Sequence, residues 1–188
     1  MSFHVDAATA LLTDVVYRPS PHCDARPPGC AVDLIVIHGI SLPPGKFGGP
    51  YITQLFTHQL DAAADPYFKT LAGLQVSSHL LLRRDGQVIQ YVPFDKRAWH
   101  AGESRYQGRV RCNDFSIGIE LEGTDDIPYT DVQYTQLAEV VAGLLHCYPA
   151  LSAQHIVGHS DIAPGRKTDP GTSFAWSRFR DLLTAKLG

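Results

Sequence analysis

Residues 33–38 read Asp33-Leu34-Ile35-Val36-Ile37-His38 and predict the central strand of the fold. The run is continuously apolar and rich in β-branched residues, a pattern typical of a strand buried on both faces. It ends at His38, and Gly39 and the turn residues Pro43-Pro44-Gly45 follow. A histidine at the carboxyl end of a buried strand is well placed for a functional site, although it can equally well be part of the core.

A second strand is predicted over residues 115–122 because apolar and polar side chains alternate there. One face carries Ile117, Ile119 and Leu121, and the other carries Ser116, Gly118, Glu120 and Glu122. The small residues next to Glu120 would leave room for a ligand, which favours a cleft on this face. A glutamate that faces solvent is the ordinary alternative.

Between these two strands, the sequence predicts a helix and a hairpin. The helix begins near Pro50, and its apolar face holds Ile52, Leu55, Phe56 and Leu60. The hairpin covers residues 76–92, and Asp85-Gly86 is a strong signal for a two-residue turn.

The C-terminal third predicts two helices and a short strand. A helix over residues 130–148 opens with Thr130 and Gln133, the pattern of a capping box. Residues 155–157 predict a short strand, and residues 176–183 predict a last helix. The order of elements indicates an α/β fold with a central mixed β-sheet flanked by helices. We expect one domain over residues 1–188, in which residues 1–30 form an irregular N-terminal arm.

Composition restricts the classes of function. The chain has 188 residues, 44% of them hydrophobic, and a net charge of −3. No basic excess indicates a nucleic-acid or membrane partner, and no apolar run is long enough to span a bilayer. The first residues lack the basic and apolar regions of a secretory signal, so we expect a cytoplasmic protein. We also expect a monomer.

The four cysteines, Cys23, Cys30, Cys112 and Cys147, form no C-x-x-C pair. This spacing argues against a structural zinc site and favours reduced thiols in the cytoplasm. Cys23 and Cys30 could still pair in an oxidising compartment.

Residues 158–171 read GHSDIAPGRKTDPG and predict a loop, because prolines and glycines punctuate them. His159, Lys167 and Asp169 bring a metal ligand, a cation and a carboxylate into this loop. A solvated turn with an internal ion pair is the simpler interpretation. However, catalytic zinc is commonly held by three protein ligands with one open position, and His38, His159 and Asp169 would supply such a set.

Several motifs along the chain resemble one enzyme family. They are Pro19 to Pro21 with Arg26-Pro27, Val36-Ile37-His38 with Ile40 to Gly45, Arg84-Asp85-Gly86, Gln90 to Phe94 with Arg97 to Gly102, Cys112 to Asp125, and Gly158 to Gly171. Together they cover residues 19 to 179 and resemble the zinc-dependent N-acetylmuramoyl-L-alanine amidases, which include phage T7 lysozyme and the peptidoglycan recognition proteins. Within this family, the chain is most similar to the cytoplasmic amidases of anhydro-muramyl peptides.

The resemblance implies an activity, a cofactor and a set of site residues. It implies one Zn²⁺ per chain on His38, His159 and Asp169, with Glu120 and Lys167 as catalytic residues. The reaction would be hydrolysis of the amide between the lactyl group and L-alanine in anhydro-muropeptides. This hydrolysis would serve peptidoglycan recycling and affect β-lactamase induction.

Substrate contacts are also expected. By resemblance, Arg111 would bind a carboxylate of the diaminopimelate in the stem peptide, whereas the aromatic rings of Tyr67 and Trp99 suit the sugar. The chain departs from many relatives at Gly39, where they carry asparagine. It departs from some at Gln75, where they carry a second peptide-binding arginine.

Two other functions are compatible with the same fold. Some peptidoglycan recognition proteins bind without catalysis, but those typically lose a zinc ligand, and this chain keeps all three. A phage-type lytic amidase would act on intact wall, but the chain shows no wall-binding domain.

Overall fold

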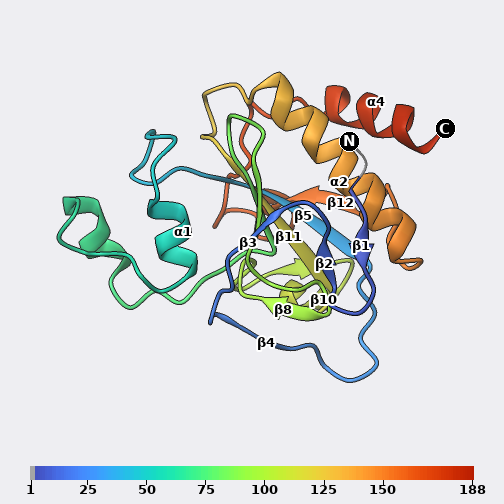
Figure 1. The fold of residues 1–188 in the computed structure, drawn as a ribbon, viewed down its shortest axis with the longest axis horizontal. Helices are drawn as coiled ribbons and strands as arrows, with labels where there is room; N and C mark the ends of the chain where they lie inside the picture. The colour runs from blue at the N-terminus through green and yellow to red at the C-terminus, as the bar shows by residue number, and fades with distance from the viewer. Residues whose placement is uncertain (1–2) are drawn as a thin grey trace.

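The computed structural model describes residues 3–188, which form one domain built on a six-stranded sheet (Figure 1). The strand order is β12-β5-β11-β6-β7-β3. The bounds are β3 Val16–Tyr17, β5 Leu34–Ile40, β6 Leu80–Leu82, β7 Val88–Gln90, β11 Ser116–Glu122 and β12 Ile156–Gly158. β7 runs antiparallel to β6 while β12, β5, β11 and β6 run parallel to one another, so the predicted mixed sheet is confirmed.

The two strands predicted first, β5 and β11, are neighbours at the centre of the sheet. They pair in parallel, and their register places Glu120 beside His38. All seven residues of β11 are buried, because helices or loops cover both faces of the sheet. Parallel pairing brings the carboxyl ends of the strands to one edge, where polar side chains from distant parts of the sequence meet.

Two helices cover one face of the sheet. α2 (Asp131–Cys147) begins with the predicted capping box of Thr130 and Gln133, and α4 (Trp176–Leu187) packs against it (Figure 1). The main hydrophobic core lies under α2 and α4 and includes the apolar face predicted for β11. The other face of β11 is therefore left for polar groups.

The opposite face of the sheet carries shorter elements. α1 (Tyr51–Phe56) and the 3₁₀ helix η1 (Pro66–Leu71) enclose a second core with Leu81 and Tyr91. The sequence predicted a longer α1 that includes Leu60, but the helix ends at Phe56, and His58 adopts a left-handed φ of 59°. That conformation cannot continue a right-handed helix.

The hairpin of β6 and β7 is confirmed, but its turn is longer than predicted. Leu82 pairs with Val88, and the amide of Arg83 donates to Gln87, so three residues close the loop. Gly86 has a φ of 89°, the left-handed conformation that a three-residue hairpin loop needs at its last position.

The arm of residues 1–30 was expected to be irregular, and this prediction is wrong in part. It contains β1 (Val5–Asp6), β2 (Leu11–Leu12), β3 and β4 (Cys23–Ala25). β3 adds to the edge of the sheet, and β4 pairs with β8 (Lys96–Ala98). Short pairings of this kind depend on partners far along the chain, which local sequence patterns do not show.

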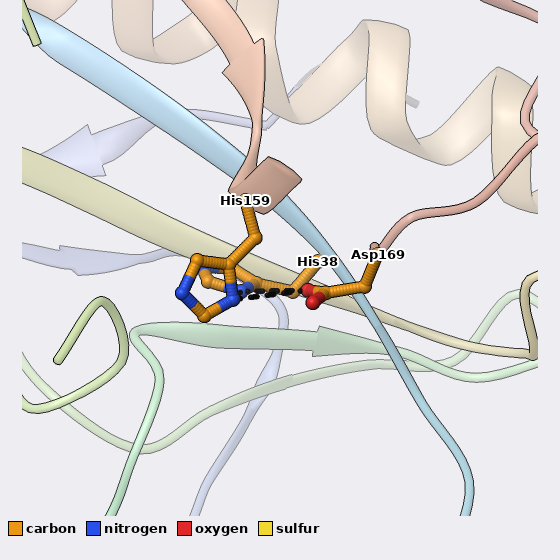
Figure 2. Close-up of side chains that lie close together, drawn as sticks. All are labelled: His38, His159 and Asp169. Carbon is orange, nitrogen blue, oxygen red and sulfur yellow. Dashed lines mark hydrogen bonds and ion pairs between the residues drawn. The ribbon is translucent and has the colours of Figure 1, made fainter. Parts of the chain in front are cut away.

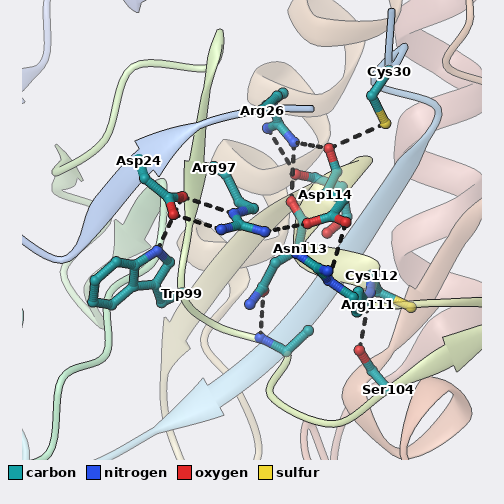
Figure 3. A network of polar contacts seen from close by, with 12 residues as sticks. Asp24, Arg26, Cys30, Arg97, Trp99, Ser104, Arg111, Cys112, Asn113 and Asp114 are labelled. Atoms are coloured by element: carbon teal, nitrogen blue, oxygen red, sulfur yellow. Dashed lines mark hydrogen bonds and ion pairs between the residues drawn. The ribbon is translucent and has the colours of Figure 1, made fainter. Parts of the chain in front are cut away.

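Arg26 fixes the end of the arm to the start of β11. Its guanidinium donates to the carbonyls of Asn113 and Asp114 (Figure 3) and also to those of Phe94 and Ser116. Burial lowers the pKa of Arg26 to about 10. The arm therefore helps to position the strand that carries Glu120.

Four short elements complete the fold. They are β9 (Arg105–Tyr106), β10 (Arg109–Val110), the 3₁₀ helix η2 (Cys112–Asp114) and α3 (His159–Ile162). The prediction of a loop over residues 158–171 therefore needs a correction, since its second to fifth residues form a helical turn. The Asp161 carboxylate accepts from the Gly158 amide and so caps α3.

None of the helices within residues 3–188 is both long and apolar enough to cross a membrane. The four cysteines are all free thiols.

Candidate metal centre

His38, His159 and Asp169 meet at the carboxyl edge of the sheet (Figure 2). His38 lies in β5, His159 opens α3 after β12, and Asp169 lies in the loop that follows. The two Nδ1 atoms are 3.0 Å apart, and each lies 3.2 Å from Asp169 Oδ2. The fold thus brings together the three ligands expected from the sequence.

This spacing suits a metal ion. Three ligands of a tetrahedral zinc, each about 2.0–2.1 Å from the ion, lie about 3.3 Å from one another. Protons alone do not satisfy the group, because two neutral imidazoles that face each other through Nδ1 can share only one hydrogen between them. Two imidazoles and a carboxylate are also ligands that zinc accepts. The residues present therefore fit a zinc ion.

The protonation of His38 and Asp169 supports the same conclusion. Burial lowers the pKa of His38 to about 4, so its ring is neutral at pH 7. Burial of Asp169 opposes its ionisation, but the neighbouring imidazoles of His159 and His38 outweigh burial and hold the pKa of Asp169 well below its usual value. A neutral imidazole and an ionised carboxylate are the forms that bind a metal.

His100 and the Ala101 carbonyl orient the two imidazoles. His38 Nε2 lies 2.9 Å from His100 Nδ1, and His159 Nε2 donates to Ala101 O at 3.1 Å. His100 Nε2 in turn lies 3.1 Å from Ser116 Oγ. These contacts leave Nδ1 of His38 and His159 free to bind the metal, as outer partners of metal-binding histidines commonly do.

The sequence did not identify His100 as the partner of His38. Of His79, His100 and His155, only His100 makes this contact. His79 accepts from the Gly118 amide, and His155 packs its ring against Tyr106. The motif that contains His100 drew attention to Trp99 instead, and only the fold shows that His100 points inward.

Glu120 lies in the same site. Its Oε1 is 4.0 Å from His38 Nδ1, and its buried Oε2 has no hydrogen-bond partner within residues 3–188. Burial and the nearby charge of Asp169 raise its pKa well above the usual value, and Lys167 partly opposes this effect. A buried carboxylate with a free oxygen beside a metal centre can accept a proton from a water molecule bound there.

A cavity of about 200 Å³ opens onto these groups. Its polar lining consists of His38, Ser77, His100, Glu120, His159, Lys167 and Asp169, and its apolar lining includes Leu55, Phe56 and Leu74. Lys167 is exposed and reaches the cavity from the loop after α3. Every residue predicted for metal binding or catalysis therefore lines one cavity.

The side chains predicted for substrate binding lie outside this lining. Trp99 donates through Nε1 to Asp24 (Figure 3). Its ring also stacks on His22, with an angle of 9° between the rings. Tyr67 lies in η1 with 41% of its surface exposed. Arg111 forms an ion pair with Asp114 and lines a separate cavity of about 500 Å³.

The two departures from the family have different structural settings. A Cβ atom at Gly39 would lie 2.3 Å from Tyr129 Oη, so the buried Tyr129 ring occupies the space of a side chain there. The Tyr129 hydroxyl donates to Pro170 O, next to Asp169. Gln75 is exposed between Leu74 and Val76, which both line the metal-centre cavity.

Comparisons with known proteins agree with this site. The family model of N-acetylmuramoyl-L-alanine amidases matches residues 28–172. The chain is 62% identical over 166 residues to the 1,6-anhydro-N-acetylmuramyl-L-alanine amidase AmpD of Escherichia coli K12, covering 88% of this chain and 90% of that relative.

Solved structures show the same likeness. A crystal structure of a selenomethionine AmpD derivative is 60% identical, with a TM-score of 0.91 over 93% of this chain and 97% of the other. The amidase AmiD from E. coli, in complex with the substrate anhydro-N-acetylmuramic acid-L-Ala-D-γ-Glu-L-Lys, is 29% identical, with a TM-score of 0.58 over 84% and 60% of the two chains. The chain therefore belongs to the N-acetylmuramoyl-L-alanine amidase family and is an enzyme of that class.

Proposed function

We propose that this protein is a zinc-dependent amidase that cleaves the bond between the lactyl group and L-alanine in 1,6-anhydro-N-acetylmuramyl peptides. The observation that carries the proposal is the group of His38, His159 and Asp169, whose three ligand atoms converge within 3.2 Å beside the unpaired carboxylate oxygen of Glu120. We propose these three side chains as the ligands of one Zn²⁺ per chain.

A bound zinc ion would supply Lewis-acid chemistry, which polarises a carbonyl group and makes water more acidic. Glu120 accepts a proton from the attacking water through the oxygen that no group within residues 3–188 engages. The same carboxyl then gives the proton to the alanine nitrogen as the carbon–nitrogen bond breaks. The products are the lactyl carboxylic acid and the free amine of the peptide, so atoms and protons balance.

Lys167 and His100 complete the proposed catalytic arrangement. The ammonium group of Lys167 faces the oxygen of the scissile carbonyl, where negative charge develops, and one such donor contributes a rate factor of about 100 or more. His100 holds the His38 ring in the orientation that directs Nδ1 at the metal. The apolar side of the cavity, with Leu55 and Phe56, excludes water from the reacting bond.

The choice of anhydro-muropeptides rests on the relatives. AmpD of E. coli is named for this substrate, and the structure of AmiD contains an anhydro-muramyl tripeptide. We therefore place the protein in cytoplasmic peptidoglycan recycling, as a monomer. In bacteria whose β-lactamase is induced by accumulated anhydro-muropeptides, loss of this enzyme would raise that induction. The aromatic rings of Tyr67 and Trp99 are proposed as sugar contacts.

Mass spectrometry of anhydro-muramyl tripeptide tests the proposal directly. Incubation with the protein should release free tripeptide and anhydro-muramic acid, and no other bond should break. Pretreatment with a chelator should abolish the release, and added Zn²⁺ should restore it. Glu120→Gln should reduce turnover by about 100-fold or more, the usual scale for a general acid–base group.

A parallel incubation with insoluble cell wall tests the lytic alternative. The proposed enzyme releases little peptide from intact wall. Efficient release from wall with poor cleavage of the anhydro tripeptide would contradict the recycling function and support a lytic amidase. Binding of the tripeptide without cleavage, in the presence of Zn²⁺, would support a recognition module.

A further inference from the structure

Asn113 lies in η2, just before β11, and its carboxamide contacts the segment of His100 and Ala101 (Figure 3). Its Oδ1 accepts from the amide of His100 at 3.1 Å and from the amide of Ala101 at 2.8 Å. Two N–H donors need an acceptor, so the oxygen of the carboxamide and not its nitrogen faces this segment. Within residues 3–188, neither amide makes another hydrogen bond.

The same two residues provide the outer contacts of both metal-binding histidines. The His100 ring lies 2.9 Å from His38 Nε2, and the Ala101 carbonyl accepts from His159 Nε2 at 3.1 Å. A single oxygen atom of Asn113 therefore fixes the backbone from which both contacts are made. Asn113 itself does not line the metal-centre cavity, so its effect on the histidines passes through His100 and Ala101.

Asn113 is held in place from behind. Arg26 donates through Nη1 to Asn113 O at 3.1 Å and to Asp114 O at 3.0 Å. Arg97, in the strand β8 that leads to His100, forms an ion pair with Asp114. These contacts join η2 to the segment that it supports, so the carboxamide has a fixed position.

We propose that Asn113 is a positioning residue of the metal centre, which sets the affinity for zinc through His38 and His159 together. This inference rests on the proposed function. The alternative is that the carboxamide only closes a loop and contributes to stability without any effect on metal binding. Loss of an outer partner of a metal ligand commonly lowers metal affinity by about 10–100-fold, so the two roles predict different results.

The zinc affinity of the full chain and its variants, measured by competition with a chelating dye, tests the inference. Asn113→Ala should bind zinc about 10–100-fold more weakly than wild type, because both outer contacts lose their support. Asn113→Asp should keep the affinity within about threefold of wild type, since a carboxylate oxygen accepts the same two hydrogen bonds. If Asn113→Ala does not fold, Asn113→Ser takes its place, because its shorter side chain also fails to reach the two amides.

A double variant tests whether Asn113 acts on both histidines. His100→Ala removes the outer partner of His38 and leaves the Ala101 carbonyl in the chain. Asn113→Ala added to His100→Ala should lower the zinc affinity by about a further 10-fold, because His159 still depends on Ala101. No further decrease would mean that Asn113 acts through His100 alone and would overturn the inference.

Gln90→Ala is the matched control. Gln90 is also an amide side chain whose oxygen accepts from a backbone amide, that of Leu12 at 2.7 Å, but it lies in β7 and does not line the metal-centre cavity. It should lower the melting temperature and leave zinc affinity unchanged, as well as the rise in melting temperature on zinc addition. Asn113→Ala should show a smaller rise, because weaker binding gives less stabilisation by mass action.

Two results would overturn the inference and leave the proposed function intact. They are wild-type zinc affinity in folded Asn113→Ala, and an affinity of Asn113→Asp as low as that of Asn113→Ala. If the wild-type protein binds no zinc, the proposed function fails, and the inference fails with it.

Discussion

Glu120 and Glu122 stand two residues apart on one face of β11, and their surroundings give them different roles. Glu120 lines the metal-centre cavity, and one of its buried oxygens has no hydrogen-bond partner in the part of the chain that the structure describes. Glu122 is fully engaged, since its carboxylate accepts from the amides of Gly48 and Arg84 and lies 3.8 Å from the Arg83 guanidinium. The first carboxylate is available for chemistry, and the second holds two loops together.

The raised pKa of Glu120 predicts a pH-dependent stability of the metal-free protein. At a pH below the unfolded pKa of a glutamate, about 4.3, the carboxyl is neutral in both states and its burial costs little. As the pH rises through the raised folded pKa, the unfolded state gives up its proton more readily and the folded state loses stability.

Chelator-treated Glu120→Gln should therefore have a higher melting temperature than chelator-treated wild type at pH 8. The expected difference is about 2–4 °C for each 1 kcal/mol by which the substitution raises the free energy of unfolding. The gap should narrow toward pH 4. Thermal melts at both pH values measure it, and a gap that stays constant or widens on acidification would contradict the assignment.

Glu122→Ala should damage stability more than chemistry. It leaves two backbone amides without their acceptor, at a cost of about 1–3 kcal/mol for each group that stays buried. We expect a lower melting temperature and a kcat, per folded molecule, within a few-fold of wild type. A 100-fold loss of kcat at an unchanged melting temperature would mean that the general base is Glu122.

The residues of the site differ in how far the sequence predicts their roles and contacts. Local patterns made His38, His159 and Asp169 candidates only, and the resemblance to the amidase family singled them out as the ligand set. His100 was not singled out, because its contacts with His38 and Ser116 join residues 62 and 16 positions away. Tyr129 likewise fills the space beside Gly39 only in the folded chain, so the sequence could not predict this contact.

The strand β11 shows how one element sets the geometry of the site. Its apolar face packs into the core under α2, while Ser116, Gly118 and Glu120 face the metal centre. This division followed from period-two alternation in the sequence.

The length of the hairpin turn between β6 and β7 could not be predicted in the same way. Asp85-Gly86 suits loops of two or three residues, and the pairing of Leu82 with Val88 decides between them.

Gly118 provides the space for the His100 ring. A Cβ atom at this position would lie 2.5 Å from His100 Cγ, so Gly118→Ala should displace the ring from His38. We expect zinc affinity to fall by about 10–100-fold, the usual effect of losing an outer partner of a metal ligand. Competition with a chelating dye measures the affinity.

Gly165→Ala is a control for this change, since a Cβ atom there meets nothing within 4 Å. It should leave the affinity unchanged even if its positive φ lowers stability. Equal zinc affinity in wild type and folded Gly118→Ala would show that His100 does not position His38.

The whole molecule brings β5, β12 and the loop after α3 to one edge of the sheet, so the metal centre depends on contacts between distant segments. His38 and His159 lie 121 residues apart in the sequence and 3.0 Å apart in the fold. An ion that binds the folded state and not the unfolded chain stabilises the protein by mass action. Removal of zinc should lower the melting temperature, and readdition should restore it.

Metal content measured on four proteins tests the central claim that His38, His159 and Asp169 hold a catalytic zinc ion. Elemental analysis should find about one zinc per chain in the wild type, as expected for a three-ligand catalytic site. His38→Ala and Asp169→Ala should each lose most of the metal. Glu120→Gln should keep it and still fail to cleave anhydro-muramyl tripeptide. Stoichiometric zinc in both ligand variants, or none in the wild type after purification with zinc present, would contradict the account.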